Sequence, residues 1–171
     1  SMPNATFLNF TDGQNITKVT SYERVKRGVG YVPQGREIFN RLTVEENLRM
    51  GLAVKPGGTP IPAELFELFP ILKQFMHRRG GDLSGGQQQQ LAIARALAME
   101  PVLLIGDEPV SALDVSVQAQ VLRLLDDVRK KFDLAVLFIT HDLRVAAQIC
   151  DRIAVMERGV VVETGATADV F

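Results

Sequence analysis

The chain has 171 residues, 46% hydrophobic and 23% charged, which fits one globular domain and excludes a disordered chain. Its formal net charge of −1 argues against a general nucleic-acid or membrane-surface binder, which would carry a basic excess. A single cysteine, Cys150, excludes an internal disulfide, and no apolar run reaches the roughly 18 residues of a membrane-spanning helix.

The first residues, 3–42, are expected to form part of an α/β core, with no charged-then-apolar leader ahead of them. Asp12-Gly13 predicts a hairpin between two short β-prone runs. A short helix is predicted over Ser21–Gly28, and a strand over Val29–Val32. Pro33, which cannot donate to a sheet ladder, is expected to end that strand.

Residues 43–99 are predicted to form a helical subdomain. Thr43–Glu46 has the spacing of a capping box, and its helix is expected to run to about Val54. Apolar residues then recur at helical spacing over Ala63–Arg78, with Pro70 as the expected kink.

Residues 100–171 are expected to complete the α/β core. Val102–Ile105 and Ala135–Ile139 are continuous apolar runs, which are typical of parallel strands buried on both faces. Val115–Lys131 is amphipathic and predicts a helix between them, capped by Asp114. The remaining predicted elements are a helix after His141 and strands over Arg152–Glu157 and Val160–Glu163.

Polar side chains follow each predicted core strand, where ligands of parallel sheets bind. Asp107 and Glu108 follow an apolar run and could hold Mg²⁺ and face an attacking water, or they could form a solvated turn. His141 could contact a phosphate or start a helix. Gln34 could ligate Mg²⁺ or be an ordinary loop residue.

The stretch LSGGQQQQLAIARAL contains a second capping box, formed by Ser84 and Gln87. Gly85 and Gly86 leave the backbone N–H groups unobstructed where the helix begins. The stretch therefore indicates either an anion site at a helix N-terminus or only a well-capped helix.

The order of these motifs resembles that of the ATP-binding cassette (ABC) ATPases over nearly the whole chain. The matches are Gln34 to the Q-loop, LSGGQ to the signature motif, Asp107 and Glu108 to Walker B, Ser111–Asp114 to the D-loop, and His141 to the switch histidine. The resemblance implies an α/β fold that is a partial P-loop NTPase fold with a helical subdomain.

The same resemblance implies roles for these residues with ATP and Mg²⁺ as cofactors. Asp107 and Gln34 would support the metal, Glu108 would be the general base and His141 would contact the γ-phosphate. The residues expected to contact nucleotide are Gln34, Ser84, Gly85, Gly86, Gln87 and Asp114. For the signature residues Ser84–Gln87, that nucleotide would be held mainly by an opposite subunit.

The family's phosphate loop, G-x-x-x-x-G-K-[ST], is absent from the 171 residues. We interpret the chain as truncated before the Q-loop, without the Walker A strand, loop and helix. Alone, it is expected to bind ATP weakly or not at all. Bare strand edges and faces would favour a homo-oligomer or pairing with a partner ATPase subunit, with a rearranged fold as a further alternative.

Two halves of the chain resemble different importers, with a changeover near Ala98–Val102. The front is similar to branched-chain amino-acid and urea importer ATPases, and the back to oligopeptide and dipeptide importer ATPases. The leading hypothesis is a subunit that joins membrane transport subunits at the cytoplasmic face. The alternatives are a non-enzymatic assembly or regulatory module and, disfavoured by the near-neutral charge, a nucleic-acid-linked ATPase.

Overall fold

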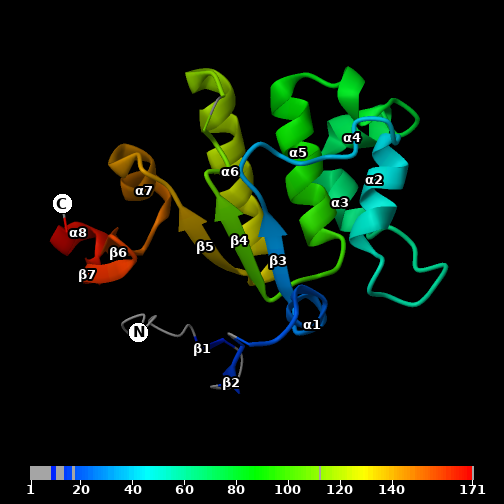
Figure 1. Ribbon diagram of the computed structural model, residues 1–171. Coiled ribbons are helices and arrows are strands. Elements are labelled where there is room, and N and C mark those ends of the chain that lie inside the picture. Colours follow the sequence, from blue (N-terminus) through cyan, green and yellow to red (C-terminus); the bar gives the residue numbers. More distant parts are fainter. Residues whose placement is uncertain (1–8, 11–13, 17, 112, 171) are drawn as a thin grey trace.

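A computed structural model describes residues 9–10, 14–16, 18–111 and 113–170. Its central element is a parallel sheet in the order β3-β4-β5, made of Val29–Val32, Leu103–Asp107 and Ala135–Ile139 (Figure 1). The register pairs Leu103 with Val29 on one side and with Ala135 on the other. All three strands therefore end at the same edge of the sheet.

Helices and two hairpins surround this sheet. The helices are α1 (Ser21–Lys26), α2 (Val44–Gly51), α3 (Ala63–Leu68), α4 (Pro70–Gln74), the 3-10 turn η1 (Gly80–Asp82), α5 (Gly85–Leu97), α6 (Val115–Phe132), α7 (Leu143–Ile149) and α8 (Thr167–Val170). The antiparallel hairpins pair β1 (Asn9–Phe10) with β2 (Gln14–Asn15), and β6 (Arg152–Glu157) with β7 (Val160–Ala166). No helix in the described part of the chain is long and apolar enough to cross a membrane.

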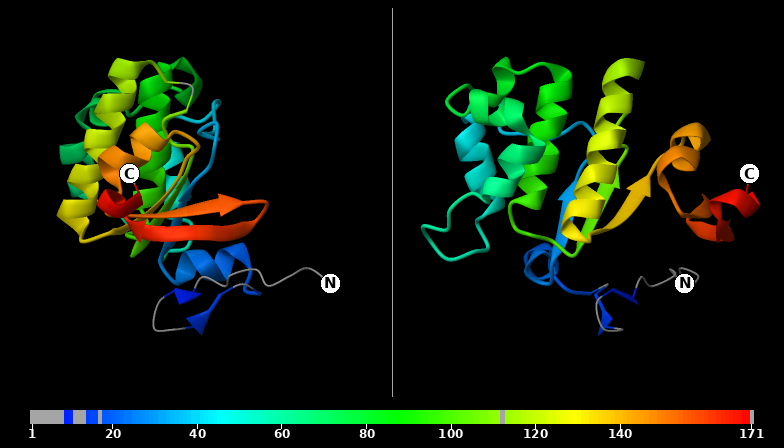
Figure 2. Two further views of the ribbon diagram at one scale, coloured as in Figure 1. Left: turned by 90° about the vertical axis from the view of Figure 1, so that its left-hand side faces the viewer. Right: turned by 180° about the vertical axis from the view of Figure 1, so that it is seen from behind.

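One face of the sheet is covered by α5 and α6 (Figure 2). Leu104 of β4 and Val32 of β3 join the main core there, with Ile93 of α5 and Val121 of α6. In Figure 1, α2, α3 and α4 lie beyond the β3 edge, and the β6–β7 hairpin lies beyond the β5 edge. The core thus joins the helices of residues 43–99 to the sheet through α5.

The opposite face of the sheet is sparsely covered. Val29 and Leu103 form only a small cluster there with Ile16. Tyr31 is 51% exposed and Ile139 is 45% exposed. The prediction that β5 is buried on both faces is therefore wrong, because this face of the sheet is sparsely covered; β5 is also an edge strand with one partner among the described strands. The expected bare edge and face are present.

Several predicted boundaries need correction. The helix expected to reach Val54 ends at Gly51. Pro70 does not kink one helix but begins α4, because the preceding residue, Phe69, leaves the helical region with φ −122° and ψ 61°. The strand expected over Val102–Ile105 runs instead from Leu103 to Asp107, since the ladder with β5 continues to its last residue. β7 extends beyond Glu163 to Ala166.

The two predicted capping boxes are both present. Thr43 accepts the Glu46 N–H at 3.2 Å, while the Thr43 N–H donates to the Glu46 carboxylate at 2.7 Å. The corresponding box on α5 is described with the site below. Asp114 takes the N-cap position of α6 but makes no side-chain cap bond, so its predicted capping role is wrong. The predicted hairpin turn at Asp12-Gly13 lies outside the described residues, although β1 and β2 pair on either side of it.

Candidate functional site

The carboxyl edge of the sheet brings Glu108 and His141 together. The ring nitrogen Nδ1 of His141 lies 2.6 Å from Glu108 Oε1, and the His141 backbone N–H donates to the same oxygen at 3.0 Å. The Glu108 side chain is 14% exposed, whereas the His141 side chain is 83% exposed. A mostly enclosed carboxylate therefore holds an open imidazole at the edge where ligands of parallel sheets bind.

The backbone of Glu108 is fixed in an uncommon conformation. Its φ is 48°, in the left-handed region that few non-glycine residues adopt. Its N–H donates to the Ile139 carbonyl at 2.9 Å. Its own carbonyl accepts the Ser111 N–H at 3.1 Å and the Ser111 hydroxyl at 2.9 Å. These bonds hold the turn against β5, and strain of this kind clusters at functional positions.

The Glu108 carboxylate raises the pKa of His141. The side-chain hydrogen bond from Glu108 is the largest cause, followed by the negative charge of the same carboxylate. Both favour the imidazolium over the neutral ring. With Nδ1 engaged by Glu108, the Nε2–H of the imidazolium is left to donate to a ligand at the sheet edge.

We expect the pKa of His141 to fall toward the ordinary histidine value, about 6.5, in the Glu108→Gln variant, which keeps the shape but loses the charge. Because the folded pKa is raised, the stabilisation by this pair is present below about pH 6.5 and is lost as the pH rises through the higher folded value. The measurement is an NMR titration of the imidazole at low and high salt. An identical His141 titration in the wild type and Glu108→Gln would contradict the pairing.

Asp107 is the last residue of β4, and its Oδ2 accepts the Tyr31 hydroxyl at 3.1 Å. Burial and this hydrogen bond raise the pKa of Tyr31. The structure places Gln34 two residues beyond β3, exposed to solvent. Tyr31 was missed in the sequence, because its contact depends on the register that pairs it with Ile105, two residues before Asp107.

The donors at this edge fit a magnesium ion only in part. Among the described residues, no group of three or more His, Cys, Asp or Glu side chains is placed to hold a metal. Mg²⁺ commonly takes one or two carboxylates and completes its shell with water and nucleotide phosphates. Asp107 fits that pattern as a single carboxylate beside Glu108, so the residues suit a metal that arrives with a nucleotide.

The signature stretch forms the predicted cap at the start of α5. The Ser84 hydroxyl accepts the Gln87 N–H at 3.4 Å, and the Ser84 N–H donates to Gln87 Oε1 at 2.9 Å. A Cβ added at Gly85 would lie 3.1 Å from Nη2 of Arg36, whose Nη1 donates to Gln88 at 3.2 Å. Arg36 was not predicted from the sequence, and its guanidinium adds a positive charge to the anion-favouring helix N-terminus.

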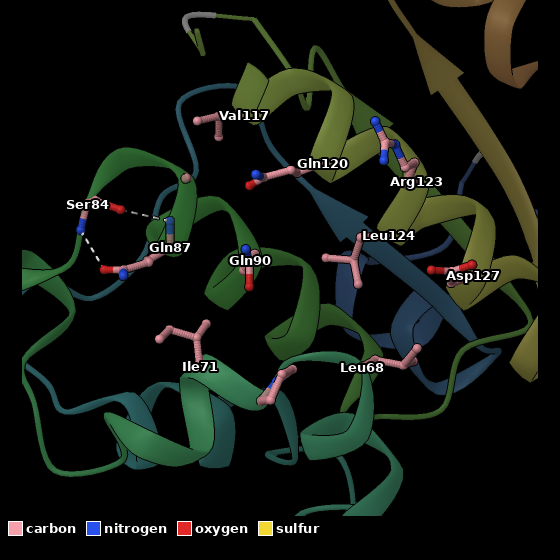
Figure 3. Close-up of a pocket in the computed structure, with 12 residues that line it drawn as sticks. Leu68, Ile71, Ser84, Gln87, Gln90, Val117, Gln120, Arg123, Leu124 and Asp127 are labelled. Atoms are coloured by element: carbon pink, nitrogen blue, oxygen red, sulfur yellow. Dashed lines mark hydrogen bonds between the residues drawn. The ribbon is translucent and has the colours of Figure 1, made fainter. Parts of the chain in front are cut away.

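A solvent-open groove of about 540 Å³ lies between the start of α5, the helix α6 and the α3–α4 turn (Figure 3). Ser84, Gly86 and Gln87 line it on the α5 side, and Val117 and Leu124 line it on the α6 side. The signature residues therefore face this groove, whereas Glu108 and His141 form a separate pair at the sheet edge. Asp114 is exposed at the start of α6.

The family profile described as ABC transporter matches residues 8–111. The chain belongs to the ABC transporter family. Methionine import ATP-binding protein MetN 1 of Staphylococcus aureus (strain N315) is 39% identical over 165 residues, covering 94% of this chain and 48% of that protein. This ABC family chain thus spans about half the length of the curated relatives it matches. The alignment crosses the expected changeover near Ala98–Val102, so the two-part resemblance stays an interpretation.

Solved structures of ABC proteins share the fold. One is a dimeric post-hydrolysis state of the ATP-binding cassette MJ0796 bound to ADP and Pi, with TM-score 0.75, 28% identity, and coverage of 92% of this chain and 72% of that one. Another is cbiO1 from Clostridium perfringens, described as part of the ABC transporter complex cbiONQ, with TM-score 0.76, 24% identity, and coverage of 93% and 65%. The fold is therefore the P-loop NTPase fold of ABC ATPases, represented in part.

Proposed function

We propose that this chain is an ATP-binding subunit of an ABC-type importer, whose signature stretch contacts ATP held on the phosphate loop of an opposite subunit. The observation that carries the proposal is the Glu108–His141 pair beside Asp107 at the carboxyl edge of a parallel sheet. The similarity to a protein named for methionine import supports an importer, while the transported substrate is not specified by these residues.

The two groups of the pair divide the chemistry between them. Glu108 Oε1 accepts both contacts from His141, which leaves Oε2 to accept a proton from a water. The imidazolium favoured by Glu108 then presents Nε2–H to a phosphate oxygen. A magnesium ion held by Asp107, with Gln34 as a further oxygen donor, would supply Lewis-acid polarisation of that phosphate.

The start of α5 contributes to a different nucleotide from the one that Glu108 serves. The Ser84 hydroxyl and the amides of Gly85 and Gly86 lie at a helix N-terminus with the Arg36 guanidinium beside it. We propose that they contact ATP held by an opposite subunit, with Gln87 and Asp114 near the same contact. The signature side of the groove would then lie at an interface between subunits.

This arrangement defines the proposed partners. A second ATPase subunit, from a related chain that carries a phosphate loop, would hold the nucleotide that the signature stretch contacts. Membrane transport subunits would anchor the assembly at the cytoplasmic face of the membrane, and no nucleic acid is required. The open face and edge of β5 are consistent with contacts that a larger assembly completes.

One observation favours a second candidate function. The signature residues Ser84, Gly86 and Gln87 line an open groove that lies apart from the Glu108–His141 pair. A non-enzymatic assembly or regulatory module would need only the binding surfaces. Such a module would associate with an ABC ATPase without completing a catalytic site.

The test is a composite assay. A full-length ABC ATPase that keeps its phosphate loop but has alanine for its own signature serine is mixed with this chain, and association and ATP turnover are measured. We expect the chain alone to be inactive and the mixture to turn over ATP. Ser84→Ala should lower the turnover about tenfold or more, because it removes a donor to the phosphate.

Thr43→Ala is the matched control, since it deletes the hydroxyl of the other capping box. Either substitution should cost about 1 kcal/mol of stability, but only Ser84→Ala should affect turnover. Association without turnover would favour the assembly module. Equal turnover with the wild type and Ser84→Ala would contradict the proposed role of the signature stretch.

A further inference from the structure

Gly86 and Val117 form a tight contact between the first turns of α5 and α6. A Cβ added at Gly86 would lie 2.6 Å from Val117 Cγ1, a distance that real Cβ contacts do not show. The side chain of Val117 therefore occupies the space that the missing Cβ leaves free. Figure 3 shows Val117 on α6 beside the groove that Ser84 and Gln87 also line.

This contact connects two parts of the proposed site. Val117 lies in the first turn of α6, which follows the segment that begins at Glu108. Ser111 fixes the start of that segment through its two hydrogen bonds to the Glu108 carbonyl. On the other helix, Gly86 lies inside the cap made by Ser84 and Gln87. The packing of Val117 on Gly86 therefore links the turn that carries Ser84 and Gln87 to the helix that follows the Glu108 segment.

Burial in the core does not by itself explain the position of the Val117 side chain. The α6 residues that are buried in the core are Val121, Leu122, Leu125 and Val128, each at most 7% exposed. Val117 packs against the margin of this core but is only half-buried, and it borders the open groove. As a β-branched residue in a helix it is largely restricted to one side-chain rotamer, so its Cγ1 is held at a fixed position.

We infer that Val117 is a positioning residue, which fits the notch at Gly86 and sets the place of the signature turn relative to the Glu108 segment. The inference rests on the proposed function, because it concerns the turn that would contact an opposite subunit's nucleotide. The packing of Val117 on Gly86 does not depend on nucleotide, so it can be tested separately from turnover.

The geometry predicts that a second substitution, at Val117, reverses the destabilisation caused by Gly86→Ala. Gly86→Ala should place its new methyl against Val117 Cγ1 and push the two helices apart. In Gly86→Ala/Val117→Ala, the nearest remaining atom of residue 117 would be its Cβ at 3.8 Å, an ordinary van der Waals distance. The double variant should therefore regain most of the melting temperature that Gly86→Ala loses, and Val117→Ala alone should leave a gap.

The first readout is amide hydrogen exchange in the chain alone. Val117→Ala should accelerate exchange at Gln87 and Ser111, whose N–H groups bond to Ser84 and Glu108, and should leave the Glu46 N–H of the other capping box unchanged. Unchanged exchange at both Gln87 and Ser111 in Val117→Ala would overturn the inference, whether or not the chain functions as proposed.

The second readout is the composite turnover assay with Val117→Ala and Val117→Thr. Threonine keeps the branched shape and should keep turnover, whereas alanine should reduce kcat about tenfold or more, in line with the cost of small misplacements in catalytic sites. An inactive wild-type mixture would reject the proposed function, leaving the exchange result to decide on Val117. An active mixture with equal kcat for Val117→Ala would reject the positioning role alone.

Discussion

Replacing Gly51 with alanine should lower the free energy of unfolding by about 3 kcal/mol or more. Gly51 is the last residue of α2, and a Cβ there would lie 2.1 Å from the carbonyl oxygen of Arg95 in α5. It would also approach the Ala98 Cβ to 3.2 Å. The obstructing atom belongs to a helix backbone, so the strain cannot be relieved by rotating a side chain.

Urea denaturation of Gly51→Ala and Gly57→Ala provides the comparison. Gly57 has no atom within 4 Å of an added Cβ, and its φ is not in the left-handed region. Gly57→Ala should therefore be neutral or gain up to about 1 kcal/mol by restricting the unfolded chain. Equal stability of the two variants would contradict the close approach of α2 and α5.

The features predicted correctly are those specified within a few residues. The capping boxes at Thr43 and Ser84 set the starts of α2 and α5, because the residues that bond to one another are only three apart. The bounds of β5 at Ala135 and Ile139 were predicted from an uninterrupted apolar run. The strand ends that carry Glu108 and His141 share one edge, as expected of parallel strands, but the contact between the two side chains was not predicted.

The features that could not be predicted depend on contacts between distant segments. Arg36 lies beside Gly85, and Val117 beside Gly86, only because α5 packs against both the loop after β3 and α6. Asp114 has the residue type of a cap, yet it makes no cap bond. Nothing in the sequence indicates that Gly51 contacts α5. Local propensity cannot supply such distances, since packing sets them.

The loop before α2 depends on one buried side chain, Asn47, and we expect Asn47→Ala to cost about 3 kcal/mol. Asn47 is 0% exposed. Its Oδ1 accepts the Phe39 N–H at 2.9 Å, and its Nδ2 donates to the carbonyls of Phe39 at 3.0 Å, Leu42 at 3.3 Å and Thr43 at 2.9 Å. Alanine would leave these groups without the amide while also opening a cavity.

Three variants separate these causes in chemical denaturation. Asn47→Asp keeps the shape and one acceptor but places a carboxylate against carbonyl oxygens, so it should destabilise at least as much as Asn47→Ala at neutral pH. Asn40→Ala is the control, because Asn40 is exposed in the same loop and should change stability by less than about 0.5 kcal/mol. If Asn47→Asp were as stable as the wild type, the Nδ2 bonds would not hold the loop.

The loosening caused by Asn47→Ala should extend from Phe39 to the signature turn. The Arg95 guanidinium lies 5.2 Å from the Phe39 ring centroid and donates to the Glu37 carbonyl at 2.9 Å. Loosening Phe39 therefore loosens the loop that carries Arg36 to the start of α5. In amide exchange, Asn47→Ala should first deprotect the Phe39 N–H. The hydrogen bond from Arg36 to the Gln88 side chain should weaken as the loop loosens. Protection of Phe39 equal to that in the wild type would show that the loop is held by other groups.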